Sequence, residues 1–327
     1  GSEMCIRDSL YTGWTYTYRT YATNWAGSGW ADPEEFSTAY LPRLVEIPTT
    51  SNLVLWLDGD DPATVQTNGS GAVTNWVDKS GQGNDAENVE GTPSVVIYGA
   101  NDRGAVAFDG VDDLLYTSDL DSGLDAGYTI FTVARYVGDD NERVIGSKTR
   151  DWVFGYNNAK DEQWYAEGDI HSTGTSNLQW HVHAGTITSN ADPVAHFWKD
   201  GSELTAGAGD TGSHNTNYEP GQLALGGLKY DNPGAPQFAE CEVSEVLVFN
   251  GVLSASDLNA VGSYLAYKYG LTTAYPAYDG TLLIGVTNKP ATLITNTSAT
   301  VNGTVNASNA VITVSAYYGQ TDGTTNA

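Results

Sequence analysis

Basic residues are scarce in this sequence. Its 327 residues include 14 Lys and Arg against 40 Asp and Glu, so the formal net charge is −26. A surface of that sign repels nucleic acid and anionic lipid unless a local basic stripe breaks it, and no window gathers more than a few Lys or Arg. We therefore expect no nucleic-acid partner.

Long apolar runs are also absent. No stretch approaches the ~20 residues that a membrane-spanning helix needs. The N-terminal part contains no apolar segment placed between basic residues and a small-residue cleavage site. We expect neither membrane insertion nor a signal peptide within these residues.

Cysteine is nearly absent, with only Cys5 and Cys241. No disulfide framework is indicated, and Cys241 is expected to be a small buried hydrophobe. Residues 1–9 match no fold pattern and are interpreted as a cloning or assembly scar. One Met, 37 Gly, 20 Tyr and 9 Trp with little Lys are typical of exported bacterial surface proteins, so we expect an extracellular or cell-surface location.

Short β-type runs recur between Gly, Asn and Asp residues, and their spacing predicts an all-β sandwich, jelly roll or barrel. The apolar run 246–249 has no polar face, which predicts central strands of two stacked sheets. The predicted strands are 53–58, 95–98, 105–109, 128–137, 143–147, 152–156, 178–188, 194–199, 223–226 and 242–249.

One helix is predicted from about residue 254 to 268. Ser254 and Asp257 form a capping box, and Gly270 is a C-terminal stop signal. Three apolar residues recur at helical spacing, namely Leu258, Val261 and Leu265. The helix should lie across the sandwich.

The acidic residues concentrate in the middle of the chain, whereas both flanks are nearly neutral and rich in Thr, Asn and Tyr. Pro48 and Pro276 mark the two changes in composition. We predict a central domain at 47–277 between flanks at 10–46 and 278–327.

Several segments of the central domain are similar, in the same order, to those of a known family of domains. In order, they are Leu53-Val-Leu-Trp-Leu-Asp58, residues 75–85, 106–113, 180–186, 197–201 and 242–271. They resemble the laminin-G-like, concanavalin-A-like lectin/glucanase jelly rolls of bacterial multidomain surface proteins. The resemblance implies a two-sheet antiparallel jelly-roll sandwich with one C-terminal helix. It also implies an extracellular binding module, often for glycans and often with a structural calcium.

The flanks resemble incomplete fibronectin-type-III-like repeats. Residues 10–27, with Tyr16 near the corner position, are similar to the last strands of one repeat, and residues 297–304 to the first two strands of another. This implies neighbouring repeats of a longer parent protein. The two halves could pair into one immunoglobulin-like sandwich, or they could remain as exposed edges.

Calcium is the expected ligand of the acidic loops. It takes six to eight oxygen ligands, which clustered Asp, Asn and Ser side chains supply without rigid geometry. The alternative is that these acids cap turns and hydrate an acidic surface. The candidates are Asp58 with Asp60 and Asp61, then Asp78 with Ser80 and Asn84, and Asp109 with Asp112 and Asp113.

His181 and His183 share one face of a predicted strand, opposite Trp180 and Val182. Two imidazoles at this spacing could hold zinc, but zinc needs further ligands, and none can be named. We therefore expect a polar, exposed sheet face, with a metal role as the alternative.

An enzyme interpretation rests on Glu240, Glu242 and Glu245. Concanavalin-A-like retaining glycosidases resemble this segment in carrying acids at similar intervals on one strand, where the two catalytic carboxyls lie ~5 Å apart. Strand alternation places Glu242 opposite Glu245 unless a bulge intervenes, so the pair would not converge. We expect no catalysis, and a glycoside hydrolase or polysaccharide lyase is the alternative.

Aromatic residues predict glycan binding, because an exposed ring offers an apolar face to a pyranose while nearby polar groups bind its hydroxyls. The favoured pair is Trp164 and Tyr165, with Asp161 close by in sequence. The further candidates are Trp152, Tyr156 and Tyr230. We therefore predict a non-catalytic carbohydrate-binding or adhesion module, with a structural or protein-binding spacer as the alternative.

Overall fold

Two units make up the chain in a computed structural model. The larger unit is Val45–Thr281, and the other contains Gly1–Leu44 and Leu282–Ala327. The structure describes residues 15–18, 21–24, 27–30, 32–37, 47–124, 127–166, 168–188, 194–204, 219–228, 236–278, 285–292 and 300–306.

The first large sheet of unit Val45–Thr281, called sheet 1 here, has nine antiparallel strands. Their order is β19 (Ser202–Leu204), β18 (Ala195–Lys199), β17 (His181–Thr188), β12 (Gly127–Asn141), β22 (Gln237–Asn250), β10 (Ala105–Asp109) and β9 (Ser94–Val96), while β5 (Leu53–Asp58) and β21 (Gly227–Leu228) also pair with β22. Since β10 pairs with residues 240–243 of β22 and β5 with residues 245–249, these two strands follow one another along the same side of β22.

The second large sheet, sheet 2, also has nine antiparallel strands. Their order is β16 (Asp169–Thr173), β15 (Lys160–Ala166), β14 (Trp152–Asn157), β13 (Ile145–Ser147), β20 (Gln222–Leu225), β11 (Leu114–Asp119), β8 (Ala86–Glu90), β7 (Val73–Trp76) and β6 (Val65–Thr67). Two short 3-10 helices, η1 (Ala100–Asp102) and η2 (Asp121–Gly123), lie in the connecting loops.

The inner faces of the two sheets form one hydrophobic core. Phe108, Val246 and Val248 enter it from sheet 1, and Phe154 and Trp164 from sheet 2. The alternation of apolar residues along each strand explains this layer, because every second side chain faces inward. The predicted all-β, two-sheet sandwich is therefore confirmed.

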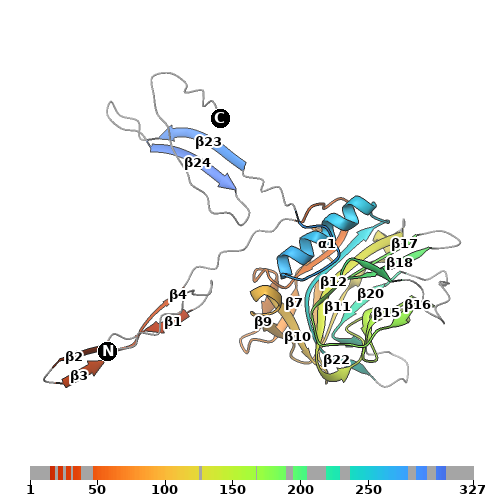
Figure 1. Cartoon of the computed structure of the whole chain (residues 1–327), viewed down its shortest axis with the longest axis horizontal. Coiled ribbons are helices and arrows are strands. Elements are labelled where there is room, and N and C mark those ends of the chain that lie inside the picture. The colour runs from red at the N-terminus through yellow and green to blue at the C-terminus, as the bar shows by residue number, and fades with distance from the viewer. Residues whose placement is uncertain are drawn as a thin grey trace. The chain divides into compact units, whose positions relative to one another are not determined.

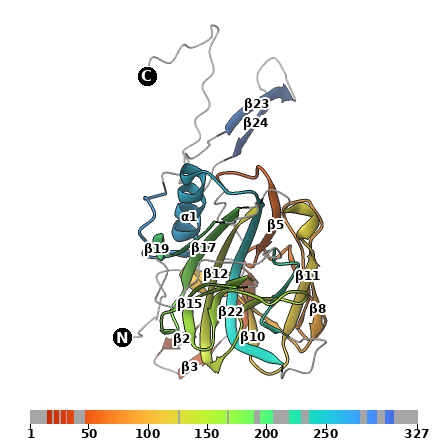
Figure 2. The same cartoon turned by 90° about the vertical axis from the view of Figure 1, so that its right-hand side faces the viewer.

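Helix α1 (Ala255–Tyr269) covers the outer face of sheet 1 (Figure 1 and Figure 2). Its N-cap Ser254 accepts a hydrogen bond from the backbone N–H of Asp257, and Gly270 closes it in the left-handed conformation at φ 63°. The predicted helix is thus confirmed. Val261 and Leu265 pack against Leu247 and Phe249 of β22, which gives the molecule a second apolar layer.

The first and last segments of this unit meet in that second layer. Ile47, which precedes β5, and Tyr278, which follows α1, both pack against the cluster that contains Leu247 and Val261. The ring of Tyr278 lies 5.3 Å from the ring of Tyr267, measured between centroids. The beginning and the end of the unit are therefore held on the same covered face of sheet 1.

The predicted strand bounds hold for some strands and differ for others: the apolar run 114–116 of β11 was not predicted, and β17 begins at His181 rather than at residue 178. Strands β5 and β10 have the predicted bounds, 53–58 and 105–109. By contrast, β15 and β16 were not predicted, because polar side chains such as Asp161, Gln163 and His171 fill buried positions in them.

The flanks contain three two-stranded ladders among their described residues. β1 (Thr15–Tyr18) pairs with β4 (Glu34–Ser37), and β2 (Tyr21–Asn24) with β3 (Gly27–Trp30). β23 (Gly285–Thr292) pairs with β24 (Thr300–Asn306). The fibronectin-like assignment and the pairing of the two halves stay predictions.

Gly185 of β17 provides a test of core packing. An added Cβ would lie 2.6 Å from Phe154 Cε2 and 2.8 Å from Trp164 Cζ3, so these rings would have to move. We expect Gly185→Ala to lower the free energy of unfolding by roughly 1–3 kcal/mol in urea titrations followed by tryptophan fluorescence. Gly69→Ala is the matched control because nothing lies within 4 Å of its added Cβ. Equal stabilities of the two variants would contradict this account of the core.

Candidate functional site

A buried cluster of charges lies between α1 and sheet 1. Lys268 Nζ is 2.7 Å from Asp58 Oδ1 and 2.7 Å from Glu245 Oε2. The exposed side-chain fractions are 3% for Lys268, 7% for Asp58 and 0% for Glu245. A lysine from the helix therefore joins carboxylates from β5 and β22.

Three uncharged side chains donate hydrogen bonds to the carboxylate of Glu245. Trp56 Nε1 and the Tyr264 hydroxyl donate to Oε1, each at 2.9 Å, and the Tyr269 hydroxyl donates to Oε2 at 2.8 Å. Burial raises the pKa of Glu245, although Lys268 acts in the opposite direction. Burial alone would also raise the pKa of Asp58, but the charges of Lys268 and Lys79 outweigh it and lower that pKa to about 2.

A β-bulge changes the arrangement of the β22 glutamates. Across β12, Val133 pairs with Glu245 while the next residue, Ala134, pairs with Val243, so Ser244 is the extra residue. Glu242 and Glu245 therefore share the outer face of sheet 1, whereas regular alternation predicted opposite faces. That part of the prediction is wrong because of the bulge.

Although Glu242 and Glu245 share a face, their carboxylates are not placed to act together on a substrate. Glu245 is sealed beneath α1 and has no route to a substrate. Glu242 Oε2 accepts from Arg135 Nε at 2.9 Å. Glu240 lies against the backbone of Gly138, where an added Cβ would overlap its carboxylate. Burial beneath α1 thus separates Glu245 from solvent, and the glycosidase or lyase alternative stays a prediction.

The loop of Asp78 is held by hydrogen bonds. Asp78 Oδ1 accepts from the backbone N–H groups of Trp56 and Ser80, while Oδ2 accepts from the Ser80 hydroxyl and the Asn84 N–H. Asn84 Nδ2 and the Ser80 hydroxyl also reach the carbonyl of Val54. These contacts correspond to the turn-capping alternative.

The acids of the β5 loop have cationic partners. Asp58 binds Lys79 as well as Lys268, and Asp61 Oδ2 lies 2.9 Å from the same Lys79. Asp60 Oδ2 lies 2.6 Å from Arg103 Nη1. Salt bridges therefore occupy the oxygens that were predicted to ligate calcium in this loop.

The third predicted loop brings its three carboxylates together. One oxygen of each of Asp109, Asp112 and Asp113 lies within 4.8 Å of the others. Asp113 is buried and accepts from the N–H groups of Thr92 and Asp109, whereas Asp109 and Asp112 are exposed. Calcium stays a prediction, and this loop suits it better than the other two because two of its carboxylates face solvent.

The two strand histidines face the interior of the sandwich. His181 Nδ1 lies 2.6 Å from Asp200 Oδ2, and His183 Nε2 lies 2.6 Å from the carbonyl oxygen of Asp161. Lys199 Nζ is 2.9 Å from Asp161 Oδ2. The two histidines share a face as predicted, but the expectation that this face is exposed is wrong because sheet 2 covers it.

Three of the predicted sugar-binding aromatics belong to the core. Trp152, Tyr156 and Trp164 are fully buried between the sheets, so the prediction that they face a glycan is wrong. Tyr165 follows Trp164 on β15, points to the other face and is half-buried. Asp161 is buried with Lys199, and Tyr230 lies outside the described residues.

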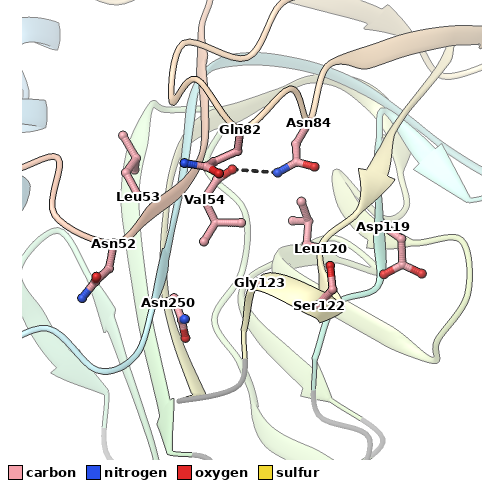
Figure 3. Close-up of a pocket in the computed structure, with 10 residues that line it drawn as sticks. All are labelled: Asn52, Leu53, Val54, Gln82, Asn84, Asp119, Leu120, Ser122, Gly123 and Asn250. Atoms are coloured by element: carbon pink, nitrogen blue, oxygen red, sulfur yellow. Dashed lines mark hydrogen bonds between the residues drawn. The ribbon is translucent and has the colours of Figure 1, made fainter.

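A pocket of about 390 Å³ opens at one end of the sandwich (Figure 3). Its walls come from the start of β5, the loop before β8, the loop containing η2 and the end of β22. Most of its polar side chains are neutral. The lining residues are Asn52, Leu53, Val54, Gln82, Asn84, Asp119, Leu120, Ser122, Gly123 and Asn250.

Several polar groups of this pocket are available to a ligand. Among the described residues, the side chains of Asn52, Gln82 and Ser122 have no hydrogen-bond partner. Asn84 donates from Nδ2 to the Val54 carbonyl and is thereby fixed in place, as Figure 3 shows. Leu120, which is buried, forms an apolar part of the lining.

Sequence reasoning named Asn84 as a metal ligand and missed the rest of the pocket. Asn52 and Asn250 are adjacent because the backbone N–H of Asn250 donates to the carbonyl of Asn52. The available signal was positional, since asparagines flank the predicted strands 53–58 and 242–249. Only the pairing of β5 with β22 brings these strand ends together.

No protein-family model matches the chain, and no curated protein matches it. Among solved structures, Trypanosoma rangeli sialidase with 2,3-difluorosialic acid is 18% identical at a TM-score of 0.46, covering 69% of this chain and 35% of that chain. Domain 4 of AbnA, a GH43 extracellular arabinanase from Geobacillus stearothermophilus in complex with arabinotriose, is 13% identical at a TM-score of 0.42. That match covers 65% of this chain and 98% of the AbnA domain. The botulinum neurotoxin serotype D binding domain is 15% identical at a TM-score of 0.42, and the match covers 65% of this chain and 52% of the toxin chain.

These similarities do not assign a function. The chain spans about a third of the length of the sialidase. All three TM-scores are below 0.5, and all three identities are below 20%. Within the described residues, no helix is long and apolar enough to cross a membrane.

The buried His183 predicts a pH dependence of stability. Burial, with neighbouring His181, lowers the pKa of His183 from 6.5 to about 3. Between these values the unfolded chain binds a proton that the folded chain does not, so stability falls as pH falls through this window, by up to about 1.4 kcal/mol per pH unit. Urea unfolding of His183→Gln between pH 6 and 4 should show a shallower slope than wild type.

His196→Gln is the matched control for that measurement, because the His196 side chain is half exposed. It should keep the wild-type slope. A wild-type slope in His183→Gln would contradict the assignment.

Calcium is tested by melting temperature. If the 109–113 loop binds calcium, adding the ion should raise Tm and a chelator should reverse the change, because a ligand of the native state stabilises it. Asp112→Asn should abolish the shift, while Glu87→Gln, an exposed acid of β8, should leave it intact. An unchanged wild-type Tm in millimolar calcium would rule out this site.

Proposed function

We propose that unit Val45–Thr281 is a non-catalytic carbohydrate-binding or adhesion module of an extracellular or cell-surface protein. A glycan would dock in the pocket at the end of the sandwich. The observation that carries the proposal is the neutral, amide-rich lining contributed by Asn52, Gln82, Asn84 and Asn250.

The chemistry of this lining suits a polyhydroxylated ligand. A sugar hydroxyl both donates and accepts, and an amide side chain offers both groups without placing a charge in the site. Leu53, Val54 and Leu120 supply apolar surface for the C–H faces of a sugar ring. The volume, about 390 Å³, is within the range of small-ligand sites.

The laminin-G-like assignment is part of this proposal. The segments that carry the resemblance fall on β5, β10, β17, β18, β22 and α1 of the larger unit. Fibronectin-like neighbours in a longer parent protein would present the module away from a cell surface. Calcium, proposed at Asp109, Asp112 and Asp113, would act as a structural ion.

Two other functions compete with this proposal. The first is a structural spacer that binds another protein or has no ligand, and the second is a glycosidase or polysaccharide lyase. The sealed position of Glu245 speaks against hydrolysis by the β22 glutamates. Release of reducing sugar by the full chain would support the enzyme instead.

A glycan array probed with the full chain tests the proposal. We expect binding to a defined subset of glycans, with Kd roughly fivefold weaker in Gln82→Ala or Asn52→Ala, since each substitution removes about 1 kcal/mol of hydrogen bonding. Gln179→Ala, an exposed residue outside the pocket, should bind as wild type does. Binding to no glycan, or equal loss in all three variants, would overturn the proposal.

A further inference from the structure

The charge cluster beneath α1 has the geometry of a reaction site. Lys268 Nζ lies 2.7 Å from Asp58 Oδ1, an oxygen bonded to the carboxyl carbon Cγ. A second carboxylate, Glu245 Oε2, lies 2.7 Å from the same nitrogen. An amine, an acyl carbon and a proton acceptor thus converge within one solvent-excluded space.

Two tyrosine rings of α1 line the same space, where they attract the ammonium group of Lys268 and exclude water from it. Lys268 Nζ lies 5.6 Å from the centroid of the Tyr264 ring and 5.2 Å from that of Tyr269. Charges enclosed by such groups lose their hydration and recover it only in part through their mutual attraction. Condensation of the amine with one carboxylate removes a positive and a negative charge together.

We propose that Lys268 and Asp58 join spontaneously in an intramolecular isopeptide bond, with Glu245 as the proton-relaying group. Nζ bonds to Asp58 Cγ, and one Cγ–O bond breaks. Of the three protons on the ammonium group, one stays on the amide nitrogen and two leave with the carboxylate oxygen as water. The step is charge-balanced and needs no oxidant, reductant or co-reactant.

Glu245 is placed to carry those protons. It touches the attacking nitrogen directly, and donors from Trp56, Tyr264 and Tyr269 hold its carboxylate in position. It would accept a proton from the ammonium group to release the nucleophile and return it to the departing oxygen. Its pKa, raised by burial, makes it a better proton acceptor than an exposed glutamate.

A second lysine on the same carboxylate provides an internal comparison. Lys79 Nζ lies 2.9 Å from Asp58 Oδ2, but its side chain is 24% exposed and its other carboxylate partner, Asp61, is 33% exposed. Water can hydrate this ammonium group and keep it charged. Lys79 therefore remains an ion-pair partner and takes no part in the condensation.

The bond would join the first and last regular elements of the larger unit. Asp58 ends β5 and Lys268 lies in the last turn of α1, 210 residues apart in sequence. A cross-link across so long a segment restricts the unfolded chain, as a disulfide does. It would give this protein a covalent closure without cysteine.

Intact mass spectrometry of the denatured full chain tests the proposal. We expect a mass one water molecule below that of the sequence once the purified protein has been incubated to a constant mass. Tryptic digestion should yield a branched peptide that joins the segments containing Asp58 and Lys268. An unmodified mass in the folded wild-type protein would overturn the bond, whatever the variants do.

Three variants assign the roles. Lys268→Met should restore the full mass, and Glu245→Gln should do so while circular dichroism shows a folded chain. Lys79→Gln should keep the deficit. Loss of the deficit in Lys79→Gln alone would overturn the choice of lysine, and a deficit that persists in Glu245→Gln would overturn the relay.

Discussion

The contact of Lys268 with Asp58 and Glu245 is the interaction on which the arrangement of the larger unit depends. It joins α1 to β5 and β22 beneath an otherwise apolar cover. Removing Lys268 would leave Glu245 as an uncompensated buried charge, which costs several kcal/mol. The helix therefore has a fixed position over the middle of β22, where the bulge at Ser244 turns Glu245 toward the helix. The Asn250 end of the same strand contributes to the pocket.

Much of the fold could be predicted from the sequence, because apolar patterning and helix capping are local. Strands β5 and β10 and helix α1 follow from runs of apolar residues and from Ser254 and Gly270. Strand β15 could not be predicted, since its buried Asp161 finds a partner, Lys199, from a strand far away in sequence. A buried charge is stable only when a partner from elsewhere in the fold compensates it, and the local sequence pattern does not reveal that partner.

The candidate site was less predictable for a related reason. Aromatic residues at alternate positions, Trp152 and Tyr156 on β14, signal a buried strand face as much as a sugar platform, and the second sheet decides between these interpretations. The amides of the pocket lie near ends of strands that are far apart in the chain, and the antiparallel pairing of β5 with β22 collects them. Apolar runs in the sequence indicated β5 and β22, but not the polar side chains that lie around their ends.

The meeting of Ile47 and Tyr278 on one covered face has a mechanical consequence. If the unit is held at both ends within a longer protein, as proposed above, tension would enter it at β5 and leave it just beyond α1. These two elements touch through Asp58 and Lys268, so the proposed isopeptide bond would carry the load between them and relieve the hydrogen-bonded ladders of both sheets. The loops that line the pocket would then keep their shape under tension.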